Sequence, residues 1–135
     1  MSQLYEQAWS QGNVDVLDEV MSEGHIQRDM VWSGASPEGR AGMQRGVTGY
    51  RRWFPDLNFT IKSLVADVEQ KICFVEWVAE GTYSGVIEGH EEPGEKESFG
   101  GVSALTIENN QIVESRVYRN ASQGERRMFL SRMDE

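Results

Sequence analysis

Apolar side chains near the start of the chain recur with the period of an α-helix, in two short segments separated by Gly12-Asn13. We therefore expect two short helices, with Asn13 as the N-cap of the second. The apolar positions of the two segments are Leu4, Tyr5, Ala8 and Trp9, followed by Val14, Leu17, Val20 and Met21.

One strand and one longer helix are predicted next. Residues 25–33 (HIQRDMVWS) have the composition of a strand, and the loop after them places Ser36 to cap and Pro37 to open a helix. Pro55 ends that helix. Its inward face is expected to consist of Met43, Val47, Tyr50 and Phe54, with Arg45 and Arg52 on the outer side.

From Leu57 to about Arg119 the pattern changes to the two-residue period of strands. Residues 84–98 are dense in Gly and Glu and predict a long exposed loop or hairpin tip, whereas Asn109-Asn110 suits a tight turn with left-handed backbone. A last short helix is expected from about residue 123 to 133. The predicted strands cover residues 57–65, 71–83, 99–108 and 111–119.

Segregated helices and antiparallel strands indicate an α+β fold, in which a curved sheet wraps over the helices. The 135 residues have the length of a single domain, 1–135. No apolar run approaches the roughly 18 residues that span a bilayer, and the start has no signal-peptide pattern. We expect a cytoplasmic protein that does not enter membranes.

The formal net charge of −9 argues against a nucleic-acid partner, because the long-range field repels phosphate backbones. Two arginine pairs, Arg51/Arg52 and Arg126/Arg127, are more simply explained as solvated helix faces. Cys73 is the only cysteine and lies in an apolar run, so it is expected to be a small buried residue.

Known cofactor motifs are missing from the sequence. His25 and His90 are the only histidines, and neither has a second ligand at the spacing of a zinc site. Neither a dinucleotide-binding GxGxxG nor a P-loop occurs, and there is no GxSxG elbow. We expect no metal and no organic cofactor.

Aromatic side chains are unusually frequent on the predicted strands and helix. Each one alone is most simply core, but together they are more than a small domain needs for packing, so they predict a pocket for a planar or polycyclic ligand. These residues are Trp32, Tyr50, Trp53, Trp77, Tyr83, Phe99 and Tyr118.

The last strand has two faces of different character. If the face with Arg116, Tyr118 and Asn120 turns into a concave sheet, these three groups converge on a ligand and could hold carbonyl or enolate oxygens. In the opposite arrangement Val113 and Val117 face the core and the polar side faces water. The pattern alone leaves both arrangements open.

Four segments carry a family resemblance by their order and spacing: AWSQGNVDVLDEVMSE, PEGRAGMQRGVTGYRRWFPDL, KICFVEWVAEGTYSG and ALTIENNQIVESRVYRN. The stretch from Trp9 to Asn120 resembles the SnoaL-like polyketide cyclases of the NTF2-like superfamily. That family typically shows FPDL at the helix end and GTHxG after the long strand, where this chain has FPDL and GTYSG. The resemblance implies a cone-shaped α+β barrel with a deep apolar pocket, frequent homodimers through the sheet, and no cofactor.

In the characterised cyclases the resemblance also implies an intramolecular aldol ring closure, with a carboxylate on the last strand. Here that position is Asn120, the usual tryptophan of the last strand is Arg116, and the first-strand histidine is Arg28. An amide cannot take a proton from carbon near neutral pH, so Asn120 is expected at most to stabilise an oxyanion.

Another carboxylate would then act as the base, and the strand-borne candidates are Asp29, Glu76 and Glu114. For Asp29 an ion pair with a nearby arginine is the simpler expectation. Arg28 and Arg116 could neutralise an anionic ligand, or form ion pairs with these carboxylates inside the cone.

Three functions stay open at this level. The first is an enzyme that cyclises or isomerises a polyketide-like carbonyl compound through an enolate, with Asn120, Arg116 and Asp29 as candidate catalytic residues. The second is a carrier of a small hydrophobic or polycyclic molecule, and the third is a dimeric protein-interaction domain. The candidate ligand-binding residues are Arg28, Trp32, Tyr50, Trp53, Trp77, Tyr83 and Tyr118.

Overall fold

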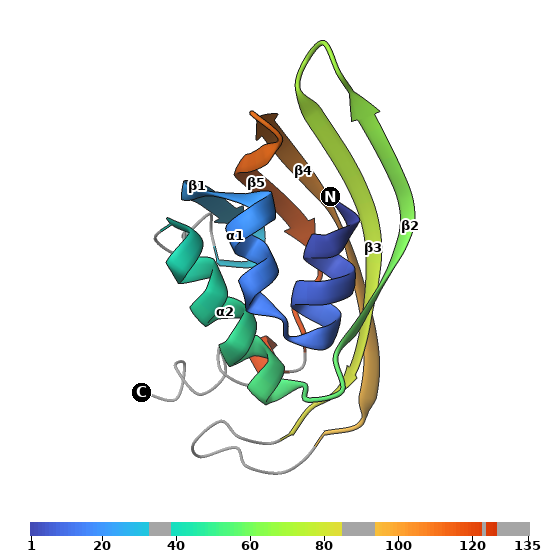
Figure 1. Cartoon of the computed structure of the whole chain (residues 1–135). Coiled ribbons are helices and arrows are strands. Elements are labelled where there is room, and N and C mark those ends of the chain that lie inside the picture. The colour runs from blue at the N-terminus through green and yellow to red at the C-terminus, as the bar shows by residue number, and fades with distance from the viewer. Residues whose placement is uncertain (33–38, 85–93, 123, 127–135) are drawn as a thin grey trace.

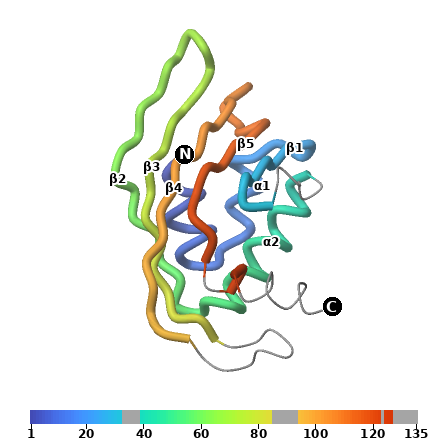
Figure 2. Tube along the Cα trace, turned by 180° about the vertical axis from the view of Figure 1, so that it is seen from behind, coloured from blue at the N-terminus to red at the C-terminus, as the bar shows by residue number. Residues whose placement is uncertain are grey.

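A computed structural model describes residues 1–32, 39–84, 94–122 and 124–126. Five strands form one sheet in the order β1-β5-β4-β3-β2. The helices lie on one face of this sheet, and the long strands bend around them (Figures 1 and 2). The strands are β1 (Met21–Asp29), β2 (Asn58–Asp67), β3 (Ile72–Thr82), β4 (Lys96–Glu108) and β5 (Gln111–Arg119). The helical elements are η1 (Leu4–Trp9), η2 (Val14–Val16), α1 (Leu17–Val20), η3 (Met30–Trp32) and α2 (Gly39–Trp53).

This arrangement confirms the expected α+β architecture with a curved, mostly antiparallel sheet. Strands β2 to β5 form an antiparallel meander, while β1 pairs parallel with β5 at the edge. The predicted tight turn between β4 and β5 is also confirmed, since Asn109 and Asn110 have positive φ angles of 50° and 62°. Two consecutive left-handed residues match the right-handed twist of the flanking strands.

Strand β1 differs from the prediction at both ends. It begins at Met21, which was expected in a helix, and ends at Asp29 instead of residue 33. The early start is stabilised by pairing with β5, where Met21 lies opposite Ile112, a partner that the local pattern does not reveal. The strand ends because Asp29 Oδ1 accepts a hydrogen bond from the Val31 amide at 3.1 Å, which favours a turn.

The two expected N-terminal helices are present, but as short irregular elements. η1 is a single π-helical segment, and η2 is a 3-10 turn that continues into α1. Asn13 occupies the N-cap position of η2 without a side-chain capping bond, since its backbone carbonyl accepts from Val16 N instead. Asn13 is therefore the N-cap, as predicted, although its side chain makes no capping hydrogen bond.

Helix α2 presents the face predicted for it. Met43 and Val47 are buried, Arg45 and Arg52 are exposed, and the helix ends at Trp53 before Pro55. Ser36 and Pro37, most of residues 84–98 and most of the expected C-terminal helix lie outside the described residues, although residues 124–126 are helical.

Arg51 does not lie on a solvated helix face, as was expected for Arg51 and Arg52. Its Nη1 donates to the carbonyl oxygens of Trp9, Ser10 and Leu57 at 2.7, 2.9 and 3.0 Å. The guanidinium therefore connects α2 to the end of η1 and to the start of β2. These bonds fix Trp9 between the sheet and α2, where it packs on Phe59 of β2 and on Tyr50 of α2.

Candidate functional site

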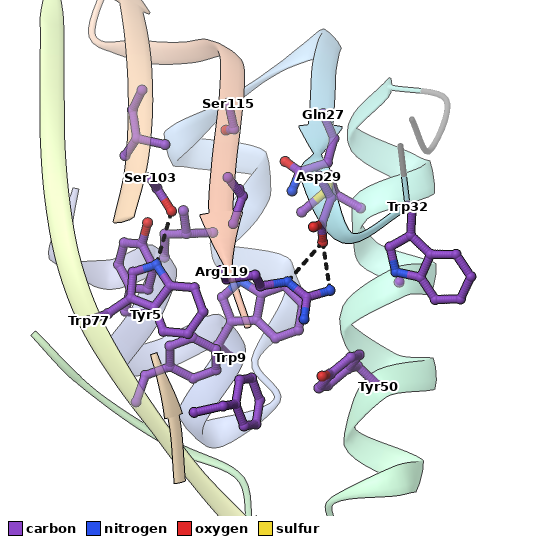
Figure 3. A pocket seen from close by; sticks show the side chains of 17 residues that line it. Tyr5, Trp9, Gln27, Asp29, Trp32, Tyr50, Trp77, Ser103, Ser115 and Arg119 are labelled. Atoms are coloured by element: carbon purple, nitrogen blue, oxygen red, sulfur yellow. Dashed lines mark hydrogen bonds and ion pairs between the residues drawn. The ribbon is translucent and has the colours of Figure 1, made fainter. Parts of the chain in front are cut away.

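A cavity of about 390 Å³ lies between the inner face of the sheet and the helices η1 and α2 (Figure 3). Most of its lining is apolar or aromatic, which suits a small organic ligand. The apolar lining residues are Leu4, Tyr5, Trp9, Trp32, Met43, Tyr50, Phe59, Trp77, Phe99, Leu105 and Val117, with Gly46 on α2.

Apart from Ser103 on β4, the polar lining residues lie on the two adjacent strands β1 and β5. Gln27 and Asp29 alternate inward on β1, and Ser115 and Arg119 do so on β5. In the parallel register Gln27 lies opposite Ser115 and Asp29 lies opposite Val117. The cavity therefore has one polar wall, β1 with β5, facing aromatic side chains from η1, β2 and β3.

A β-bulge decides which face of β5 turns inward. Ile112 pairs with Ile107 and Glu114 pairs with Thr106, so Val113 is an extra residue on β5. Ile112 is fully buried before the bulge, and after it the inward positions are Ser115, Val117 and Arg119. Of the two arrangements considered for this strand, the one with Val117 facing the core is confirmed.

Arg119 is the centre of a buried ion network. Its Nε and Nη2 donate to Asp29 Oδ2 at 3.0 and 2.8 Å, and its Nη1 and Nη2 donate to Glu125 Oε1 and Oε2 at 2.6 Å each. Nη1 also donates to the Asn120 carbonyl at 3.2 Å. These contacts use all five N–H donors of the guanidinium.

Glu125 is fully buried and holds the network together. Besides Arg119, its Oε1 accepts from the Tyr50 hydroxyl at 3.1 Å and from Ser122 N and Oγ at 3.1 and 3.2 Å. Burial acts to raise the pKa of Glu125, but the hydrogen bonds and charge of Arg119 outweigh it, and the pKa is below its ordinary value. Both Glu125 and Arg119 are therefore charged, and Asp29 supplies a second negative charge beside one cation.

Burial also shapes the neutral groups of the site. It raises the pKa of Tyr50, with the Glu125 charge adding to the effect, so this hydroxyl remains a donor to Glu125. Burial likewise raises the pKa of Tyr5, a neighbour of Ser103 on β4. Ser103 Oγ accepts a hydrogen bond from Trp77 Nε1 at 3.0 Å, which fixes the indole against the cavity (Figure 3).

Four of the ten predicted site residues line the cavity: Asp29, Trp32, Tyr50 and Trp77. Asp29 pairs with an arginine, as expected, and the arginine is Arg119. Tyr83 is fully buried against Phe54, and Trp53 packs on Tyr50, so both belong to the core beside the cavity.

The remaining four predicted residues do not line the cavity. Arg28 pairs with Glu114 at 2.9 Å. An ion pair between these two residues was expected inside the cone, but it lies on the outer side of the sheet. Arg116 and Tyr118 follow the bulge on the outward face, and Asn120 is exposed beyond the strand end. Their inward placement, one of the two arrangements left open, is therefore wrong.

Sequence reasoning missed Ser115, Arg119 and Glu125. Ser115 and Arg119 lie on the strand face that alternation assigned to Val113 and Val117. The arrangement with Val117 facing the core therefore already predicted that both residues point inward. Glu125 lies after the last strand, at the start of the segment where a short helix is expected, and nothing in that helical pattern marks it as a site residue. Its carboxylate reaches Arg119 only through the turn at Ser122, where Arg126 N bonds the Ser122 carbonyl.

Comparisons with known proteins agree with this fold. The family model for SnoaL-like polyketide cyclases matches residues 1–127. The chain belongs to this family. A comparison with curated proteins finds no sequence match.

Solved structures with the same NTF2-like fold include other SnoaL-like proteins. A candidate SnoaL-like polyketide cyclase from Jannaschia sp. CCS1 shares 20% identity over 87% of this chain and 81% of its own, with a TM-score of 0.75. IdmH, a candidate polyketide cyclase from Streptomyces antibioticus, shares 21% identity over 87% and 86%, with a TM-score of 0.72. A Catenulispora acidiphila protein with a ketosteroid isomerase-like fold, in complex with trimethylamine, shares 17% identity over 84% and 80%, with a TM-score of 0.66.

Neither a metal-ligand cluster nor a membrane-spanning helix occurs in the part of this SnoaL-like chain that the structure describes. Its described residues contain no group of three or more His, Cys, Asp or Glu side chains that could hold a metal ion. Among the same residues, no helix has the length and apolar character needed to cross a bilayer.

Proposed function

We propose that the cavity binds a small, largely apolar carbonyl compound of polyketide type and that Asp29 acts as the general base in an enolisation, leading to cyclisation or isomerisation. The observation that carries this proposal is the position of Asp29, a carboxylate in the polar wall of a largely apolar cavity. Its side chain is 16% exposed and so remains open to the cavity. The step needs only a base and a hydrogen-bond donor.

Asp29 keeps free acceptor sites on its carboxylate for this role. Its Oδ2 is held by Arg119, and its Oδ1 accepts one hydrogen bond, from Val31 N. A carboxylate has about four acceptor sites, so Oδ1 can still take a proton. In this proposal Asp29 replaces the last-strand carboxylate of the family, whose position is Asn120 here.

Arg119 is a positioning residue in this scheme. Because its five N–H groups are all donated within the protein, it has none to offer to a ligand. It orients Asp29 and balances part of the buried negative charge, and Glu125 holds it in place. We therefore do not assign it to oxyanion stabilisation.

The test uses 2-tetralone, a bicyclic ketone with exchangeable α-hydrogens. The wild-type protein is expected to accelerate exchange of these hydrogens in D₂O, followed by NMR, and Asp29→Asn is expected to abolish the acceleration. Glu76→Gln is the matched control, because Glu76 is an exposed strand carboxylate bonded to Ser63 outside the cavity. Equal exchange in wild type and Asp29→Asn would remove Asp29 from the mechanism.

A second candidate is a binding module without chemistry, for a ligand that carries an ammonium group. In the polar wall two carboxylates, Asp29 and Glu125, pair with one guanidinium, that of Arg119, so one negative charge is left over. The aromatic faces of the lining also attract cations. The trimethylamine complex of the Catenulispora acidiphila protein supports this candidate. Tetramethylammonium titrated by calorimetry would distinguish the two, since tight cation binding without ketone exchange favours the binding module.

A further inference from the structure

A second polar contact lies in the β1/β5 wall, between His25 Nε2 and Ser115 Oγ, which are 2.8 Å apart. Ser115 lines the cavity, and His25, which is 1% exposed, lies behind it. Ser115 itself is only 3% exposed, so its hydroxyl is part of a formed, desolvated wall. The mechanism around Asp29 does not use this pair.

The surroundings of His25 determine which ring nitrogen carries the proton. Its Nδ1 is buried and has no hydrogen-bond partner among the described residues. A buried N–H without an acceptor is rarer in proteins than an under-satisfied acceptor. Burial also lowers the pKa of His25 to about 4, against the opposing charge of Glu114, so the ring is neutral near pH 7. The single proton is therefore on Nε2 and is donated to Ser115 Oγ.

This tautomer decides what Ser115 can offer. A serine hydroxyl has one proton to donate, and its oxygen already accepts from His25. The Ser115 proton is then available to a group in the cavity. An acceptor such as a carbonyl oxygen is the ligand group that this donor fits.

We propose that Ser115 donates a hydrogen bond to the carbonyl oxygen of the bound ligand and stabilises its enolate, with His25 as the positioning residue that orients the hydroxyl. This inference rests on the proposed function, because it supplies the electrophilic partner of the base Asp29. Ser115 is then a catalytic residue by direct contact with the reacting oxygen.

The spacing of the two groups fits a carbonyl and its α-carbon. Gln27 lies opposite Ser115, and Asp29 is two residues further along β1 on the same face. Two residues along a strand correspond to about 6.6 Å. A ligand between them can direct its carbonyl oxygen to Ser115 and its α-hydrogen to Asp29.

The step balances without a co-reactant. Asp29 removes the α-proton, the C–H electron pair becomes the carbon–carbon double bond of the enolate, and the carbonyl π pair moves to oxygen. The enolate oxygen is stabilised by the Ser115 hydrogen bond. The enolate carbon then takes a proton back from Asp29, or it attacks a second carbonyl of the same molecule, whose oxygen receives that proton.

The experiment compares 2-tetralone with tetralin, its analogue without the carbonyl. Ser115→Ala is expected to lower the α-hydrogen exchange rate about 100-fold. It should also weaken 2-tetralone binding about tenfold while leaving tetralin binding unchanged. Ser63→Ala is the matched control, because Ser63 is an exposed strand serine bonded to Glu76.

His25 is tested through the same ratio of ketone to tetralin affinity, which a purely structural role would not alter. His25→Gln keeps an N–H that can donate to Ser115 and should retain most of the ratio, whereas His25→Leu should lose it. A Ser115→Ala protein that exchanges at the wild-type rate, while Asp29→Asn does not exchange, would overturn this inference and leave the proposed function standing. Absence of exchange in the wild type would overturn both.

Discussion

Arg119 connects three parts of the chain through one side chain. It is 7% exposed and pairs with a fully buried Glu125 and with Asp29, from the tail and from β1. Buried ion pairs are seldom a net source of stability, but removal of one partner is costly because the other charges remain buried. The loss of Arg119 should therefore destabilise the protein mainly because the Asp29 and Glu125 carboxylates would remain buried without a cation.

Arg119→Met is expected to destabilise the protein by about 3–5 kcal/mol at neutral pH. Part of this loss should be regained at pH 5, because the unpaired buried carboxylates are then more easily protonated. Urea denaturation at both pH values measures the change. The control is Arg28→Met, whose pair with Glu114 is about half exposed on the arginine side and should cost less than about 1 kcal/mol. Equal losses in the two variants would contradict this account.

His25 predicts a specific pH dependence of stability. Its folded pKa, about 4, is below its ordinary value of 6.5, so the unfolded chain takes up the proton first as the pH falls. The stability contributed by neutral His25 is fully present above about pH 6.5 and is lost as the pH falls towards 4. The charge of Glu114, which is itself paired with Arg28, acts against this lowering of the His25 pKa.

Wild type should therefore lose about 2 kcal/mol more than His25→Leu between pH 7 and pH 4.5. The free energy of unfolding, measured by urea denaturation at each pH, gives the difference. The carboxylates titrate in both proteins, so their contributions to the pH dependence cancel in this comparison. Parallel pH profiles for the two proteins would show that His25 keeps its ordinary pKa.

Helix α2 carries glycines where a helix gains most from alanine. Apart from the adjoining residues and the backbone of the helix itself, no atom of the described residues lies within 4 Å of the position that a Cβ would take at Gly46 or Gly49. Gly46 lines the cavity yet is exposed, which places it at the cavity mouth. Each glycine costs the helix about 0.5–1 kcal/mol relative to alanine. At Gly46 the absence of a side chain keeps the entrance open.

Gly46→Ala and Gly49→Ala should each raise the free energy of unfolding by about 0.5–1 kcal/mol. Larger side chains should separate the two positions: Gly46→Leu narrows the mouth and should weaken binding of 2-tetralone roughly tenfold or more, and Gly49→Leu should not. Quenching of tryptophan fluorescence reports the binding, since Trp9, Trp32 and Trp77 line the cavity. Similar affinities in both leucine variants would mean that ligands enter elsewhere.

The strands show which local signals suffice for prediction. The predicted limits of β5 agree with the structure, and those of β3 differ by one residue at each end, because alternation and the Asn109-Asn110 turn are encoded nearby. The limits of β1 were wrong because its start depends on pairing with β5, far along the chain. One extra residue, Val113, reversed the inward face of β5, and with it the choice between Arg116 and Arg119.

At the scale of the whole molecule, the outer sheet face keeps large apolar side chains in water. Phe74, Val102 and Tyr118 are 45%, 39% and 53% exposed on three neighbouring strands, and Val102 lies directly opposite Tyr118. An exposed apolar face of an antiparallel sheet is commonly a site where a partner protein binds. Arg116, on the same face, alternates with Tyr118 and adds polar contacts to such a surface.

We therefore expect a homodimer through this face, with about twice the 15.3 kDa mass of one chain. Light scattering coupled to size exclusion measures the mass. Val102→Lys should shift it to that of the monomer, because a charge would be buried in the interface. Val68→Lys is the control, since Val68 is 87% exposed beyond the end of β2. A monomeric wild type would rule out this interface.

The parallel pairing of β1 with β5 has a consequence for the order of assembly during synthesis. The wall that holds His25 and Asp29 is completed by β5, which is synthesised after β2, β3 and β4. A nascent chain that ends at the Asn109-Asn110 turn contains the β2–β3–β4 meander and most aromatic side chains, but not β5. Until that strand emerges, β1 has no neighbour in the sheet, and nascent chains should need protection from aggregation at this stage.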